Sequence, residues 1–564
     1  MELVTSIFML LAGLGVLMTG MKLLSEGLER SAGKGMRKLF GKLSSNRFAG
    51  IGVGAVATVV VNSSAATTVM VIGFVNAGLM TLFQATSIIM GANIGTTLTG
   101  VIIALSGFGG LDVFASVLTF IGVVIVMFAK NDTLKRVGSA LSGLGLIFVG
   151  LYLMSSAFKN SAAMTGALQS LFETVTFPLL LILIGLVCTA LFQSSTAMTA
   201  LVVTMVGTII PIESAFFVIL GTNIGTCVTA LLASIGTSTN GKRTALIHLA
   251  FNVIGTVIFT ALIWIFRSQV GWLFGKMAST PQMQVALFHV IFNVFTTLLL
   301  VPFINPLTKF ATLIIKERKD DDSVLKMYYI DDRILHTPPI AVAQVLKEVV
   351  HMGEMARDNL DRAVKAVLEV DPSDKDKVLK EEEKINFINK GVARYLVKMQ
   401  SLSLSKSDEK LVGSLHHVIG DIERIGDHAE NFIEDASEMK DGGFKFSETA
   451  SAELTDMYTH VRSMFDKALY TFENRDTSAL KTVGEMESEI DGLKRTLSNN
   501  HIGRLNKGEC TVESGAHFFA IITALERVAD HLTNVAFSIR STSGSQSEAM
   551  AKLAEENAKK HGTV

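Results

Sequence analysis

The N-terminal part of the chain, 1–310, contains apolar stretches that are separated by short polar connections. Seven of these stretches hold about 20 mostly apolar residues, the length that an α-helix needs to cross the hydrocarbon core of a bilayer. The sequence therefore predicts membrane spans at 4–24, 83–105, 112–129, 138–157, 214–233, 244–266 and 285–305.

Two further apolar stretches, at 48–80 and 177–212, are interrupted in the middle by polar residues. The interruptions are Asn62, Ser63 and Ser64 in the first stretch and Gln193, Ser194 and Ser195 in the second. Each half has only about 15 residues, which is short for a crossing. A broken backbone at membrane depth is tolerated where it is buried in protein or lines a cavity. We therefore predict two re-entrant helical hairpins, with two ordinary spans that carry polar residues as the alternative.

The apolar region is duplicated, because its segments recur at a nearly constant offset along the chain. The recurring pairs are 11–15 with 141–145, 62–64 with 193–195, and 91–96 with 221–226. We predict repeats at about 1–130 and 131–266, with the span at 285–305 outside them. Three crossings in each repeat invert the second copy relative to the first, as in transporters built from inverted repeats.

Charge divides the chain into two parts. Charged residues are rare before Leu307 and frequent from Lys316 onward. The composition, with 49% hydrophobic residues and a mean hydropathy of +0.45, fits a chain of which one half lies in lipid. We predict a membrane domain at 1–310, a linker at 311–338, a helical domain at 339–543 and a flexible tail at 544–564.

Basic residues also predict the orientation. The loops expected on one side hold Arg30, Lys34, Arg37, Lys38, Lys42, Arg47, Lys130, Lys135, Arg136, Lys242, Arg243, Lys309, Lys316, Arg318 and Lys319. The opposite loops hold only Lys159, Arg267 and Lys276. Because cytoplasmic loops carry the excess of Lys and Arg, we predict an outside N-terminus and a cytoplasmic C-terminal domain at a bacterial-type inner membrane.

The polar clusters carry the candidate chemistry. The first N–H groups of each second hairpin arm lack helical partners, and with the helix dipole they favour an anion such as phosphate. Hydroxyl and carbonyl oxygens suit sodium. Glycines around Asn93 and Asn223 suit a break in a span, where the amides would cap a helix or face the cavity. The candidate residues are Asn62, Ser63, Ser64, Thr67, Asn93, Thr96, Gln193, Ser194, Ser195, Thr196, Asn223 and Thr226.

Neither cluster contains Arg or Lys, so an anion would be held by dipoles, hydroxyls and a co-bound cation. The alternative is that the Ser and Thr residues only support close helix packing.

The second tip, Gln193-Ser194-Ser195-Thr196, and the paired Gly-Xaa-Asn-Ile-Gly-Thr segments at 91–96 and 221–226 resemble the type II sodium/phosphate cotransporter family. The resemblance covers roughly 1–310. It implies inverted repeats, phosphate binding at the hairpin tips and sodium coupling. The first tip departs from the family pattern of Gln followed by three hydroxyl residues, because it reads Asn62-Ser63-Ser64-Ala65. This departure leaves the number of sodium ions, and the coupling ion itself, open.

The region from 339 to 543 has long charged amphipathic runs that predict helices, and it too is duplicated. Residues 421–431 recur at 524–534, and Glu382 corresponds to Glu487. Two copies of a three-helix unit predict a bundle of about six helices. In each motif Glu and Asp stand four residues apart and share a helix face. Two such pairs facing one another would suit hard divalent or iron-type metals. The candidate ligands are Glu382, Glu423, Asp427, Glu487, Glu526 and Asp530.

An alternative for these acids is a solvated face paired with Arg. The stretch resembles the PhoU family, which implies Glu-Xaa-Xaa-Xaa-Asp metal-binding motifs and regulation of phosphate uptake. The whole chain thus predicts an all-α protein, in which a polytopic membrane domain of two inverted repeats with re-entrant hairpins is joined to a cytoplasmic PhoU-like bundle.

The predicted function is sodium-coupled transport of inorganic phosphate with a regulatory domain, in either direction and without enzymatic activity. The alternatives are a membrane-anchored phosphate sensor without transport and an enzyme that uses the carboxylate-bound metals. The second is disfavoured because the chain lacks a nucleophile motif and a Gly-rich phosphate loop. The expected partners are phosphate, the lipid bilayer, a second copy of the chain and phosphate-regulon proteins. A net charge of −1 gives no case for nucleic acid.

Overall fold

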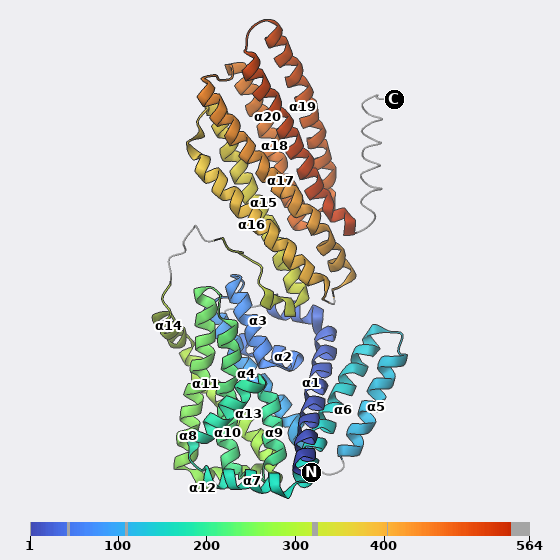
Figure 1. The fold of residues 1–564 in the computed structure, drawn as a ribbon, viewed down its shortest axis with the longest axis vertical. Helices are drawn as coiled ribbons and strands as arrows, with labels where there is room; N and C mark the ends of the chain where they lie inside the picture. Colours follow the sequence, from blue (N-terminus) through green and yellow to red (C-terminus); the bar gives the residue numbers. More distant parts are fainter. Residues whose placement is uncertain (1, 42–45, 108–110, 318–324, 403, 543–564) are drawn as a thin grey trace. The chain divides into compact units, whose positions relative to one another are not determined.

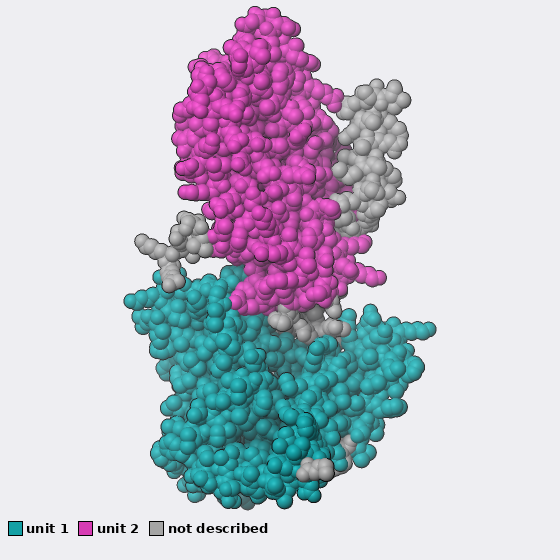
Figure 2. Space-filling view, viewed as in Figure 1, with its two compact units in different colours: residues 1–319 teal, residues 320–564 magenta. Residues whose placement is uncertain are grey.

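The computed structural model describes residues 2–41, 46–107, 111–317, 325–402 and 404–542. Within these ranges the regular structure is helical, apart from a single bridge between Val206 and Ile210, so the all-α prediction is confirmed. The chain divides into two compact units, 1–319 and 320–564 (Figure 2). The predicted tail at 544–564, together with Lys42, Arg318 and Lys319, lies outside the described residues.

Unit 1 contains the apolar helices (Figure 1). They are α1 (Glu2–Gly41), α2 (Arg47–Val61), α3 (Ser64–Asn76), α4 (Leu82–Ala104), α5 (Leu111–Phe128), α6 (Asp132–Lys159), α7 (Ala162–Thr174), α8 (Pro178–Phe192), α9 (Ser195–Met205), α10 (Ile212–Ala233), α11 (Thr239–Ile265), α12 (Arg267–Met277), α13 (Pro281–Leu300) and α14 (Ile304–Ile314). Six apolar segments among the described residues are long enough to cross a membrane, and they coincide with six of the seven predicted spans. The 18-residue helix α5 occupies the seventh. The short helices α7 and α12 are not predicted by the hydropathy pattern.

Both predicted hairpins are present. The first is α2 and α3, broken between Val61 and Ser64, and the second is α8 and α9, broken between Phe192 and Ser195. Within unit 1, α2 and α3 lie toward one end and α8 and α9 toward the other (Figure 1), which is the arrangement expected of inverted repeats.

Each first hairpin arm packs against a long helix through glycine. A Cβ atom at Gly54 of α2 would lie 1.9 Å from the carbonyl oxygen of Ile88 of α4. The second repeat has the same contact, since a Cβ atom at Gly185 of α8 would lie 2.1 Å from the carbonyl oxygen of Val218 of α10. These distances are far below a normal contact, so only glycine allows the backbones to approach this closely.

The long helices α4 and α10 run without interruption through Asn93 and Asn223. The predicted break in these spans is therefore wrong. The glycines beside the two asparagines serve close packing instead: a Cβ atom at Gly91 would lie 1.9 Å from the Ile51 carbonyl oxygen, and one at Gly221 would lie 2.0 Å from that of Ile182.

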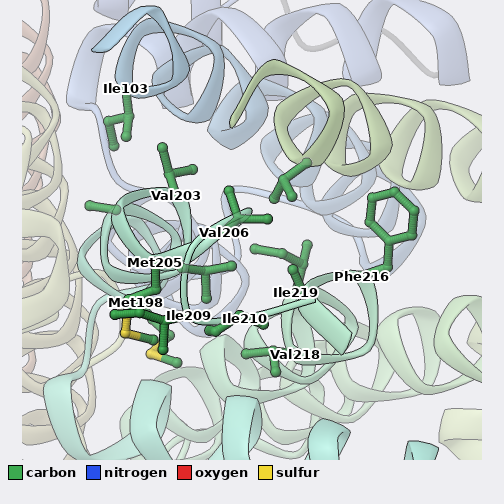
Figure 3. Close-up of a cluster of buried hydrophobic side chains, with 14 of the residues drawn as sticks. Ile103, Met198, Val203, Met205, Val206, Ile209, Ile210, Phe216, Val218 and Ile219 are labelled. Carbon is green, nitrogen blue, oxygen red and sulfur yellow. The ribbon is translucent and has the colours of Figure 1, made fainter. Parts of the chain in front are cut away.

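The second hairpin is anchored in a large apolar cluster. Figure 3 shows Met198, Val203 and Met205 of α9 gathered with Phe216 and Ile219 of α10. All five side chains are buried, and burying such side chains is the main favourable term in protein packing. The second arm of this hairpin is therefore fixed along its length, and its tip has a defined position.

Unit 2 is a bundle of six long helices among the described residues, as predicted. They are α15 (Pro338–Glu369), α16 (Lys375–Gln400), α17 (Lys406–Gly442), α18 (Glu448–Asn474), α19 (Leu480–Asn506) and α20 (Val512–Phe537). The segment before α15, which falls in the predicted linker, is tied to the bundle. The buried Glu348 carboxylate accepts backbone N–H groups of Tyr328, Tyr329 and Ile330 at 2.5 to 3.1 Å.

Replacing Gly54 by Ala should lower the stability of unit 1, because the new methyl group must displace the backbone of α4. Overpacking of this kind costs about 1–3 kcal/mol. Gly52, on the same helix, has nothing within 4 Å of its Cβ position, so Gly52→Ala is the matched control. Thermal unfolding of the two variants in detergent should show a lower midpoint only for Gly54→Ala. Equal midpoints would show that α2 and α4 do not pack as described.

Candidate functional site

The two hairpin tips have the same backbone conformation. Asn62 and Gln193 are both left-handed, with φ/ψ of 53°/28° and 51°/26°. The following residue, Ser63 or Ser194, is extended and caps the second arm. The Ser63 hydroxyl accepts the N–H of Ala66 at 3.1 Å, and that of Ser194 accepts the N–H of Ala197 at the same distance. A left-handed non-glycine residue is uncommon, and its occurrence at equivalent positions of both repeats shows that the two tips end their first arms in the same way.

The two tips line one cavity of about 200 Å³. Its lining residues come from α1, both tips and α10, and they are Met21, Lys22, Ser25, Val61, Asn62, Ser63, Ser64, Ala65, Gln193, Ser194, Ser195, Thr196, Thr226 and Thr229. Equivalent segments of the two repeats, far apart in the sequence, therefore meet at one place. Most of the predicted site residues lie here, at the interface of the two repeats.

Four predicted residues lie outside the lining. The Thr67 hydroxyl donates to the carbonyl oxygen of Ser63 at 3.0 Å and accepts from the Thr58 hydroxyl at 3.1 Å, so it supports the first tip from behind. Thr96 donates to the Ala92 carbonyl oxygen at 3.1 Å within α4.

The two asparagines of the paired segments are buried in their helices. The Asn223 amide donates to the Ile219 carbonyl oxygen at 2.9 Å, and its own oxygen lies 3.3 Å from Nε2 of His289. The Asn93 Nδ2 atom has no hydrogen-bond partner among the described residues. Neither residue is among those that line the cavity.

The first tip is held by two further contacts. The Asn62 side-chain oxygen accepts from the Thr99 hydroxyl of α4 at 2.6 Å. The Ser25 hydroxyl of α1 donates to the carbonyl oxygen of Val61, the last residue of α2. The C-terminal carbonyl groups of a helix have no partner inside the helix, so Ser25 satisfies one of them and ties α1 to the tip.

The cavity is suited to an anion. The first N–H groups of α3 and α9 belong to Ser64, Ala65, Ser195 and Thr196, all of which line it. Such N–H groups lack helical partners and stand at the positive end of the helix dipole. Two helix N-termini thus meet at one small polar space, an arrangement that favours phosphate or a similar anion.

Lys22 is a residue that sequence reasoning missed. It lies inside the first predicted span and lines the cavity. Its Nζ atom is 4.0 Å from Oε1 of Glu26. The two polar clusters contain no Arg or Lys, as the sequence shows, but the cavity that they line also includes this one basic side chain. The signal was available, because an ionisable residue inside a span is itself a functional candidate.

The predicted metal ligands of unit 2 gather within each repeat, on neighbouring helices. Burial, together with nearby Glu430, Asp427 and Glu423, raises the pKa of Glu382 to about 7. In the second repeat, burial and nearby Asp491, Asp530 and Glu526 raise the pKa of Glu487 to about 7. The acidic neighbours of Glu382 and of Glu487 lie in the same repeat as the glutamate itself. The sequence pattern instead predicted that the Glu-Asp pairs of the two repeats face one another.

Two details of unit 2 depart from the predicted metal site. Glu526 forms an ion pair with Lys494 at 2.9 Å, which is the paired arrangement of the alternative interpretation. Among the described residues, the group whose ligand atoms all lie within 4.8 Å of one another is Asp435, Glu438 and His517. In this group Nδ1 of His517 lies 2.8 Å from Oδ1 of Asp435.

Comparisons with known proteins match unit 1 and unit 2 to two different families. Residues 16–156 and 157–289 match the Na+/Pi-cotransporter family, and residues 349–436 and 454–539 match the PhoU domain. The chain is 26% identical over 542 residues to the "Putative inorganic phosphate export protein YjbB" of Escherichia coli K12, covering 94% of this chain and 96% of that protein.

Two other relatives match one part of the chain each. The protein YqeW of Bacillus subtilis 168 is 30% identical over 303 residues, covering 53% of this chain and 94% of YqeW. The PhoU homologue of Clostridium acetobutylicum is described as an accessory protein of a phosphate-specific transport system. It is 21% identical over 190 residues, covering 33% of this chain and 85% of that protein.

The acidic clusters predict a pH dependence of stability. Because the folded-state pKa of Glu382 and Glu487 is raised from 4.5 to about 7, ionising them in the fold costs free energy. This cost begins above pH 4.5 and is complete above about pH 7. Metal-free protein should therefore unfold at a lower temperature at pH 8 than at pH 5.5. Glu382→Gln with Glu487→Gln should flatten this difference, whereas Glu485→Gln, an exposed residue of α19, should not. An unchanged slope in the double variant would contradict the raised pKa values.

Proposed function

Because the chain belongs to the Na+/Pi-cotransporter family and carries a PhoU domain, we propose that it moves inorganic phosphate across the membrane in a sodium-coupled cycle. The transport site is the cavity between the two hairpin tips. The observation that carries this proposal is that equivalent segments of the two repeats, with equal backbone conformations, line the same space.

Phosphate is held mainly by backbone and hydroxyl groups. The unpartnered N–H groups at the start of α3 and α9 point to the anion from two sides, and the hydroxyls of Ser64, Ser195 and Thr196 add donors. The neutral donors of the two tips bind the anion without forming ion pairs of their own, which favours its release on the other side. Gln193 and Asn62 supply an amide from each tip, and Thr226 contributes a hydroxyl from α10.

Sodium binds next to the anion. Hydroxyl and carbonyl oxygens are the ligands that a hard cation prefers, and broken helices expose carbonyl groups at the tips. The cation offsets part of the phosphate charge. Access alternates as one repeat moves against the other around the fixed site. During this movement Thr67 holds the first tip through its hydrogen bonds to Ser63 and Thr58, and Asn223 ties α10 to His289 of α13.

The direction of transport depends on the net charge that moves in a cycle. A charge that crosses a membrane gains or loses about 2.3 kcal/mol per 100 mV. With a negative cell interior, phosphate with few sodium ions is driven outward, and phosphate with an excess of sodium ions is drawn inward. The name of the Escherichia coli relative, which matches over 94% of this chain, supports export.

Unit 2 regulates this flux from the cytoplasm and binds a divalent or iron-type metal. The basic loops support a cytoplasmic unit 2 and an outside N-terminus. In each repeat, crowded carboxylates with raised pKa values, such as Glu382 beside Glu423 and Asp427, are stabilised when a cation replaces their protons. Proteins of the phosphate regulon, or a second copy of the chain, are the partners that such a domain would contact.

Changing Ser194 and Ser195 together to Ala should abolish phosphate transport. Ser194 loses its cap and Ser195 loses a donor in the cavity. Radiolabelled phosphate flux in liposomes, with a sodium gradient imposed in each direction, measures the effect. We expect at least a tenfold loss in the double variant and wild-type flux in Ser170→Ala, a change to a hydroxyl of α7 that lies outside the cavity.

Wild-type flux that ignores the sodium gradient would contradict sodium coupling. Phosphate binding without flux in either direction would favour a sensor over a transporter.

Metal binding in unit 2 should depend on one carboxylate set in each repeat. We expect Glu423→Gln and Asp530→Asn each to lower the amount of Mn²⁺ bound by the full-length protein in equilibrium dialysis by about half. Glu485→Gln is the control. If only His517→Ala lowers binding, the metal lies at the group of Asp435, Glu438 and His517 instead.

A further inference from the structure

The cavity is symmetric at its tips but not along its wall. The wall residues Met21, Lys22 and Ser25 come from α1 of the first repeat. At the offset that relates 11–15 to 141–145, Lys22 corresponds to Tyr152 of α6 and Glu26 to Ser156. Neither of these counterparts lines the cavity. Lys22 of the first repeat is therefore a basic residue in a cavity whose other described lining residues are uncharged.

Lys22 lies on the face of α1 that contacts the first tip. Lys22, Ser25 and Glu26 stand at i, i+3 and i+4, so they share one face of the helix. Ser25 on this face donates a hydrogen bond to the Val61 carbonyl oxygen at the end of α2. The same face therefore contacts the tip, and Lys22 lies one helical turn before the contact.

The charge of Lys22 is available for a ligand. Its Nζ atom is 4.0 Å from the Glu26 carboxylate, the outer limit of an ion pair, and its side chain is 77% exposed. Loose, exposed pairs of this kind are weak. An anion in the cavity competes well for the ammonium group, whereas an empty cavity leaves Lys22 beside Glu26 and partly neutralised.

On the basis of the proposed function, we propose that Lys22 is an anion-binding residue whose positive charge takes the place of one coupling sodium ion. The first tip agrees with this role. It has Ala65 where the corresponding position of the second tip, Thr196, offers a hydroxyl oxygen. The tip nearest Lys22 thus has fewer oxygen ligands for a cation and a fixed cation next to it.

This assignment has a consequence for direction. A lysine stays with the protein, whereas a sodium ion crosses with its substrate. With Lys22 in place of one sodium ion, each cycle carries more negative charge, and an inside-negative membrane potential drives phosphate outward.

Equilibrium binding of radiolabelled phosphate to the full-length protein in detergent tests the proposal, with sodium and with choline in its place. We expect Lys22→Gln to weaken binding at least tenfold in choline, and less in sodium, because a bound sodium ion restores the missing charge. Lys22→Arg should stay within threefold of wild type. Lys159→Gln, a charge loss at the exposed end of α6, is the matched control. Size-exclusion profiles and thermal midpoints confirm that each variant is folded.

Equal phosphate affinity of Lys22→Gln and wild type in both salts would overturn the role of Lys22. The proposed function would survive that result if the wild-type protein still transports phosphate in liposomes. The reverse outcome, binding that depends on Lys22 without any wild-type flux, would support the anion-binding role of Lys22 and overturn transport. The two claims therefore fail separately.

Discussion

Unpaired backbone groups at the two helix breaks are the constraint on which unit 1 depends. A helix that stops inside a membrane leaves N–H and C=O groups without partners, and lipid offers none. The chain packs each first arm against a long helix through glycine contacts, and it places both breaks at the edge of one polar cavity. The first N–H groups of α3 and α9 then lie at one polar cavity, where the phosphate ion of the proposed function would satisfy them.

The close packing of α2 on α4 and of α8 on α10 therefore sets the position of the site. The breaks occur at Asn62 and Gln193, whose left-handed conformations turn the chain between one helix and the next. The capping serines fix the start of the next helix. Binding geometry thus follows from the packing of the arms, and the asymmetric wall of α1 adds the charge that the tips lack.

Much of this architecture could be predicted from the sequence, because it is recorded in local patterns. Polar residues in the middle of apolar runs indicated the two hairpins, and the repeat offset paired their tips. The direction in which each helix presents a given residue was harder to predict. The glycines beside Asn93 and Asn223 were expected to break a helix, but they allow close packing against a neighbouring helix. The absence of a Cβ atom makes glycine both flexible and small, so the sequence alone does not tell these two uses apart. Lys22 was missed because its sequence neighbours are apolar, and only the packing of α1 shows which of its residues face the cavity.

In unit 2 the number of long helices was predictable. The grouping of the acids within repeats and the pairing of Glu526 with Lys494 depend on three-dimensional contacts.

The central claim is that both tips hold one phosphate ion. Its most direct test is the phosphate-binding isotherm of the full-length protein, compared with those of Ser64→Ala and Ser195→Ala, one change in each tip. One phosphate per chain, bound about tenfold more weakly in each variant, is the predicted result. An isotherm that changes for one tip and not for the other, or a stoichiometry of two, would contradict a shared site.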